Sequence, residues 1–76
     1  MSEVEWLNIF ADNLLHLMVD RRMSQYELAD MTGLSQATIS KYIRKQQMPG
    51  VKALINLAYV LNCSLDELMD YGCKVR

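Results

Sequence analysis

The sequence predicts an all-α fold of five short helices in one domain spanning residues 1–76, and three observations support this. Apolar residues recur with the spacing of one helical face, as in the series Leu7, Phe10 and Leu14. Three segments begin with Ser-x-x-Glu, the capping-box pattern in which two side chains satisfy free amides of a first helical turn. No segment alternates apolar and polar residues as a half-buried strand requires.

The first helix is expected over residues 3–21. Ser2 and Glu5 form its capping box. Arg21 and Arg22 place positive charge at its end, where the helix dipole is negative. Both ends of this helix are therefore marked in the sequence.

Two shorter helices are expected next, over residues 25–32 and 36–45. Ser24 and Glu27 form the capping box of the earlier one. Ser35 is the expected N-cap of the later one, although no Glu follows it at the capping-box position.

The last two helices are expected over residues 51–61 and 65–70. Pro49 lies in a short polar segment before them, which is predicted to be a loop. Ser64 and Glu67 form the third capping box and mark the start of the final helix.

The turn between the second and third helices is the most informative feature. It contains only Gly33, Leu34 and Ser35, and glycine allows an abrupt reversal because it adopts positive φ at little cost. Apolar residues follow on one side of the third helix and polar or small residues on the other. The apolar side holds Ile39 and Tyr42, and the other side holds Gln36, Ala37, Ser40, Lys41 and Arg44. This is the layout of a helix-turn-helix, whose second helix enters a DNA major groove.

In this stretch the sequence resembles the Cro and lambda-repressor-like helix-turn-helix proteins, the regulators of the xenobiotic-response-element type. The resemblance runs from about Phe10 to Leu68 and is strongest in the segment MSQYELADMTGLSQATISKY. It implies a compact five-helix DNA-binding domain with the helix-turn-helix at its second and third helices. The helix-turn-helix core would span about 24–45, and a dimerisation region would span about 51–76.

The resemblance also implies roles for individual residues. Four residues match positions that reach base edges: Gln36, Ala37, Ser40 and Lys41. A glutamine can bond bidentately to adenine, and an alanine methyl can pack against a thymine methyl. Five residues are expected to contact phosphates: Gln25, Ser35, Thr38, Arg44 and Lys45. Phosphate contacts set the register of a protein on DNA and carry no sequence information directly.

Two positions depart from the family pattern. Ile43 replaces a glutamate found in many members, and Met18 stands where the basic partner of that glutamate would fall. We therefore expect an apolar contact between Ile43 and Met18 in place of a buried ion pair, an exchange that can be neutral or stabilising. Lys45 replaces a glycine, and positive φ costs more for a lysine. The third helix is therefore expected to end differently or to run longer.

The net charge of −1 conceals an asymmetry along the chain. Residues 1–20 contain four acidic and no basic residues, whereas residues 21–52 contain six basic and two acidic ones. Residues 53–76 contain three acidic and two basic residues. The positive block coincides with the predicted DNA-binding segment, so a nearly neutral chain is compatible with a basic face.

Helix 51–61 and the residues after it have more apolar positions than one core stripe needs. We interpret the surplus as a dimer surface that includes Ile55, Tyr59, Met69 and Tyr71. The sequence thus predicts a transcriptional regulator, expected to be a repressor, that binds double-stranded DNA as a homodimer on a pseudo-palindromic operator. The alternative is an antitoxin or another protein-interaction module whose DNA binding is secondary.

Other function classes find little support. The chain has no carboxylate pair, nucleophile–base pair or metal-ligand set at suitable spacing, so no enzyme activity, catalytic residue, metal or cofactor is expected. His16 is interpreted as a surface residue, and Cys63 and Cys73 as reduced thiols. A small-molecule effector would need another domain or protein, as in a longer sensor. No signal peptide or membrane-length apolar run is present, so a cytoplasmic protein of bacterial or phage origin, without membrane contact, is expected.

Overall fold

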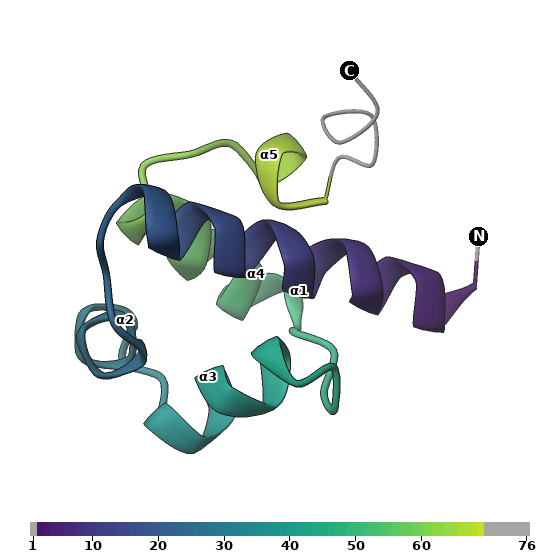
Figure 1. Cartoon of the computed structure of the whole chain (residues 1–76), viewed down its shortest axis with the longest axis horizontal. Coiled ribbons are helices and arrows are strands. Elements are labelled where there is room, and N and C mark those ends of the chain that lie inside the picture. The colour runs from purple at the N-terminus through teal and green to yellow at the C-terminus, as the bar shows by residue number, and fades with distance from the viewer. Residues whose placement is uncertain (1, 70–76) are drawn as a thin grey trace.

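The computed structural model describes residues 2–69, which form five α-helices and no strand. The helices are α1 (Glu3–Asp20), α2 (Gln25–Thr32), α3 (Gln36–Ile43), α4 (Val51–Val60) and α5 (Leu65–Met69). The all-α prediction is confirmed, and each helix begins at the expected residue. In Figure 1, α3 and α5 lie on opposite sides of the long helix α1, and both pack against it.

Local capping explains why the starts of the helices were predictable. Ser24 Oγ accepts a hydrogen bond from the Glu27 amide at 3.1 Å, and the Glu27 carboxylate accepts one from the Ser24 amide at 3.0 Å. The same reciprocal pair of bonds occurs at the other two predicted boxes, Ser2–Glu5 and Ser64–Glu67. Each box satisfies two backbone amides that a helix start would otherwise leave free.

Three helices end in Schellman motifs without a glycine. Arg22, Lys45 and Asn62 adopt φ values of 54°, 63° and 53°, the only positive φ values of non-glycine residues in the described chain. At the end of α3 the Lys45 amide donates to the Tyr42 carbonyl (3.1 Å) and the Gln46 amide donates to the Lys41 carbonyl (2.8 Å). Helix α3 therefore does not run longer. It ends at Ile43, and Lys45 adopts the left-handed conformation despite its Cβ.

The core is built from all five helices. Its fully buried large side chains within residues 2–69 are Phe10, Leu14, Leu28, Ile39, Leu57, Leu61 and Leu68. Phe10 of α1 meets Tyr42 of α3 edge to face, with ring centroids 5.6 Å apart. Met18 is buried, and Ile43 is half-buried against the same cluster. Both residues therefore belong to the apolar core, and the direct contact between them stays a prediction.

Side-chain hydrogen bonds from Asn13 and Arg21 connect α1 to the C-terminal part of the chain. Buried Asn13 donates from Nδ2 to the Leu68 carbonyl of α5 at 2.8 Å. Arg21 donates from Nε to the Leu61 carbonyl at 2.6 Å, where α4 ends and its dipole is negative. The first bond holds α5 against α1, on the side opposite α3 in Figure 1, and the second joins the end of α1 to the end of α4.

Candidate nucleic-acid interface

The turn between α2 and α3 has the geometry that a helix-turn-helix needs. Gly33 adopts φ 78°, and its amide donates to the Ala29 carbonyl at 3.0 Å. Thr32 stabilises the same turn, because its hydroxyl donates to the Leu28 carbonyl (2.7 Å) and accepts from the Leu34 amide (3.3 Å). The positive φ of the glycine was predicted, whereas the contribution of Thr32 was not.

Helix α3 presents one polar face away from the core. Ile39 and Tyr42 are buried, as expected for the side that packs against α1 and α2. The four predicted base-reading residues lie on the other side. Gln36, Ala37 and Lys41 are exposed, and Ser40 is partly exposed. The structure therefore brings these four residues together on one accessible helix face.

The first residues of α2 and α3 are joined by their side chains. Gln36 donates from Nε2 to Gln25 Oε1 at 3.1 Å. A predicted base reader and a predicted phosphate contact thus form one unit, although they are 11 positions apart in the sequence. The bond could not be predicted from the sequence, because the two glutamines lie on different helices and only the packing of α2 on α3 brings them together.

Ser35 and Thr38 cluster at the start of α3. Ser35 Oγ accepts from the Thr38 amide at 3.0 Å, which confirms Ser35 as the N-cap. The two hydroxyl oxygens are 2.8 Å apart and share a hydrogen bond. Both hydroxyls lie at the positive end of the helix dipole, the end that favours an anion.

The basic side chains predicted for phosphate contacts are both in contact with other residues. Arg44 is exposed and donates from Nε and Nη2 to Ser40 Oγ, at 3.1 and 2.7 Å. Lys45 Nζ lies 3.5 Å from Asp12 Oδ1 of α1, and both side chains are about half exposed. The ion pair between Lys45 and Asp12 was not predicted. Arg21, another member of the positive block, is bonded to the end of α4.

The predicted dimer residues fall into three groups. Ile55 and Tyr59 of α4 are 50% and 86% exposed. Val51 lies on the same face of α4, four residues before Ile55, and is 74% exposed. Met69 is instead half-buried against the core. Tyr71 lies outside the described residues.

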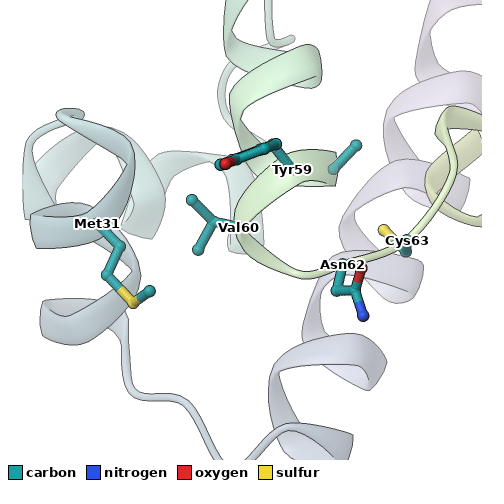
Figure 2. Close-up of a pocket in the computed structure, with 6 residues that line it drawn as sticks. Met31, Tyr59, Val60, Asn62 and Cys63 are labelled. Atoms are coloured by element: carbon teal, nitrogen blue, oxygen red, sulfur yellow. The ribbon is translucent and has the colours of Figure 1, made fainter.

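An open depression of about 580 Å³ lies beside Tyr59, between α2 and α4. Figure 2 shows Met31 of α2 facing Val60 across it, with Asn62 and Cys63 at its other end. Met31 is 58% exposed and was not singled out in the sequence. It extends the apolar surface of α4 onto α2.

Titratable groups show no sign of a reaction centre in the part of the chain that the structure describes. Burial raises the pKa of the Tyr42 hydroxyl above its ordinary value. Burial also raises the pKa of the Cys63 thiol, with a smaller contribution from Glu67 in the same direction and an opposing one from Arg21. A raised pKa makes the thiol less reactive. Between residues 2 and 69, no group of three His, Cys, Asp or Glu side chains is placed to hold a metal ion.

Comparison with known proteins agrees with this geometry. A family model described as helix-turn-helix (HTH_3) matches residues 16–68, which include the turn and most of the core. The chain belongs to the HTH_3 helix-turn-helix family. This assignment and the five-helix architecture confirm the resemblance to the Cro and lambda-repressor-like proteins.

This HTH_3 chain is similar to a named bacterial protein and to bacterial proteins whose structures have been solved. It is 30% identical over 61 residues to YqaE of Bacillus subtilis (strain 168), an uncharacterized HTH-type transcriptional regulator. The match covers 80% of this chain and 53% of YqaE, so the chain spans about half the length of that curated relative. Among solved structures it is similar to the restriction-modification controller protein C.AhdI from Aeromonas hydrophila, at 27% identity and a TM-score of 0.78. That match covers 82% of this chain and 94% of C.AhdI.

Two further structures share the fold of this HTH_3 chain. An HTH_3 family transcriptional regulator from Vibrio cholerae has a TM-score of 0.87 at 23% identity, over 97% of this chain and 42% of that one. A hypothetical transcription factor, NHTF, from Neisseria has a TM-score of 0.84 at 21% identity, over 100% of this chain and 92% of that one. No helix within residues 2–69 is long and apolar enough to cross a membrane.

Proposed function

We propose that this HTH_3 protein is a transcriptional regulator that binds double-stranded DNA in a sequence-specific manner. The observation that carries the proposal is the exposed polar face of α3 beside the Gly33 turn, with Gln36 held in place by Gln25. A helix of this kind fits the major groove with its N-terminal residues toward the base edges. The relatives YqaE and C.AhdI, a transcriptional regulator and a controller protein by name, support the same role.

The bond between the two glutamines suits adenine recognition. One hydrogen of Gln36 Nε2 is donated to Gln25, so the other is available to adenine N7. Gln36 Oε1 can then accept from the adenine N6 amino group. Gln25 keeps both Nε2 hydrogens for a phosphate oxygen. Ala37 and Lys41 flank this contact and would reach a thymine methyl and a guanine edge, respectively.

Phosphate contacts complete the proposed interface. Ser35 and Thr38 lie at the start of α3, where the free amides and the helix dipole favour an anionic oxygen. Lys45 adds a positive charge at the far end of α3. Because this lysine also pairs with Asp12, its contribution to DNA affinity should be smaller than that of an unpaired lysine.

We further propose that the regulator acts as a repressor and binds a pseudo-palindromic operator as a homodimer. The support is the exposed apolar stripe Val51, Ile55 and Tyr59 on α4, which has helical spacing and contains no charge. A two-fold axis brings a surface against its own copy, and an uncharged stripe meets no like charge there. The half-sites of such a dimer are roughly 34 Å apart.

Salt titration of DNA affinity tests the proposal. If each protomer of a dimer neutralises about two phosphates, affinity for a bound duplex should fall on the order of a hundredfold between about 50 and 200 mM salt. Sedimentation of the same protein and duplex should give two protomers per site. Binding that does not respond to salt would contradict the DNA-binding role. A monomer both free and on DNA would contradict the homodimer and favour the alternative, in which the stripe binds a different protein.

A further inference from the structure

The guanidinium of Arg44 does not extend into solvent but lies across Ser40. Its Nε and Nη2 donate to the Ser40 hydroxyl oxygen at 3.1 and 2.7 Å. Arg44 is the C-cap residue of α3 with φ −83° and ψ 4°, so its Cα still follows the helical path. Helical side chains tilt toward the N-terminus, and this contact holds the guanidinium one turn back from its own Cα.

Arg44 also has the right angular position for the groove. At about 100° per residue, the base-reading positions 36, 37, 40 and 41 span an arc of about 140° around α3. Arg44 falls at about 80° from Gln36 in that arc, close to its middle. A phosphate-contacting residue is expected at the margin of the face and not at its centre. The angular position of Arg44 therefore favours the base edges over the sugar–phosphate backbone.

The contact with Ser40 leaves the useful edge of the guanidinium available. Arginine has five N–H donors, and the two bonds to Ser40 use Nε and one hydrogen of Nη2. The remaining donors are both hydrogens of Nη1 and one of Nη2, which no other residue of the described chain engages. One hydrogen from each of these two nitrogens forms the fork that matches guanine O6 and N7.

We infer that Arg44 reads a guanine in the major groove and that Ser40 is the positioning residue that aims it. This inference rests on the proposed DNA-binding function. It replaces the phosphate contact that the sequence predicts for Arg44 and the base contact that it predicts for Ser40. Ser40 is four residues from Gln36, or about 6 Å along the helix axis. The guanine should therefore lie about two base pairs from the adenine bound by Gln36, at a base-pair rise of about 3.4 Å.

The test compares Arg44→Lys with Ser40→Ala on the site that the wild-type protein selects from random DNA. Lysine keeps the charge and loses the planar fork, so Arg44→Lys should reduce discrimination at one G·C pair by roughly five- to a hundredfold. Because the charge is retained, the salt dependence of binding should stay unchanged. Ser40→Ala should weaken discrimination at the same pair by a smaller factor. Arg22→Lys is the matched control, since Arg22 is exposed and is assigned no contact with a base, and it should change discrimination at no pair.

The outcomes separate this inference from the function on which it rests. Equal effects of Arg44→Lys on all single-base variants of the site, or no effect on any, would show a phosphate contact and overturn the assignment. An effect of Ser40→Ala at a different pair would overturn its positioning role. If the wild-type protein enriches no sequence at all, the proposed function itself fails. Circular dichroism should show that the three variants fold like the wild type, because the side chains of Arg44 and Arg22 are exposed and Ser40 is partly so.

Discussion

Gln36 is the proposed base reader whose side chain is bonded to the other helix of the motif. Its bond to Gln25 joins the two helices of the motif and orients the amide before DNA arrives. A preorganised side chain loses less rotamer entropy on binding than a mobile one. Specificity at the base pair it contacts should therefore depend strongly on this residue.

Replacing Gln36 should affect one position of the binding site. Gln36→Ala removes the proposed bidentate bond, and we expect a loss of about 1–3 kcal/mol of discrimination at one A·T pair. Lys45→Ala should instead weaken binding to all sequences equally, because a phosphate contact carries no sequence information. Competition binding with single-base variants of a bound duplex measures both effects. Equal losses on specific and random DNA for Gln36→Ala would refute its base-reading role.

Backbone conformation at single residues gives a second prediction. Arg22 adopts φ 54°, where a residue with a Cβ is strained by about 1–2 kcal/mol. Glycine removes the strain but raises the entropy of the unfolded chain, so Arg22→Gly should increase the free energy of unfolding by about 0.5–1 kcal/mol. Gly33→Ala should have the opposite effect, because Gly33 has φ 78° and an added Cβ would meet no atom within 4 Å. The loss of stability in Gly33→Ala would thus reflect backbone strain alone.

Urea denaturation distinguishes the two substitutions. The transition midpoint should rise for Arg22→Gly and fall for Gly33→Ala. A fall for Arg22→Gly would mean that the arginine side chain stabilises the end of α1 by more than its backbone strain costs.

For the helices, features set by neighbouring residues could be predicted from the sequence, whereas contacts between distant segments could not. Every helix start was predicted, and four of the five starts carry a capping serine whose partner is three residues away and needs no tertiary structure. Helix α4 is the exception, because its N-cap Gly50 makes no side-chain bond. The ends of the helices were harder to predict. Lys45 adopts the left-handed conformation at the end of α3, where a glycine would have marked the helix end in the sequence. The exposed face of α3 followed from helical phase. The pairing of Lys45 with Asp12 did not, because only the packing of α1 on α3 brings these residues together.

The bond between Asn13 and the Leu68 carbonyl was equally invisible in the sequence, as 55 positions separate the two residues. It attaches the five-residue helix α5 to α1. Asn13→Ala leaves the buried carbonyl without this donor, so we expect a loss of about 1–3 kcal/mol in unfolding free energy. Limited proteolysis should then cut near residues 65–69 faster than in the wild type.

Asn8→Ala is the control for that prediction, because Asn8 is an exposed asparagine on the same helix. It should be nearly neutral. If both substitutions have the same small effect, the bond from Asn13 does not stabilise the position of α5.

The whole molecule should lose stability in alkaline solution. Burial raises the pKa of Cys63 above its ordinary 9.0 and that of Tyr42 above its ordinary 10.0. The folded state then holds protons that the unfolded state releases, so the free energy of unfolding is complete below about pH 9 and falls as pH rises through the folded pKa values. Cys63→Ser should make this fall shallower. Urea denaturation between about pH 7 and 10.5 measures it, and a rise in stability over that range would contradict the account.

At the scale of the whole molecule, the two proposed activities use different helices. DNA is assigned to the polar face of α3, and the second copy is assigned to the exposed stripe Val51, Ile55 and Tyr59 on α4. We propose that two copies pair through α4 while each keeps its α3 face free for a half-site.

Selection of bound duplexes from a random DNA pool is the decisive test of sequence-specific recognition by α3. We expect an enriched pseudo-palindrome with half-sites about one helical turn apart. Each half-site should contain the A·T pair contacted by Gln36. A pool that stays random after repeated rounds, at a salt concentration where the protein still binds DNA, would contradict sequence-specific recognition by this helix-turn-helix.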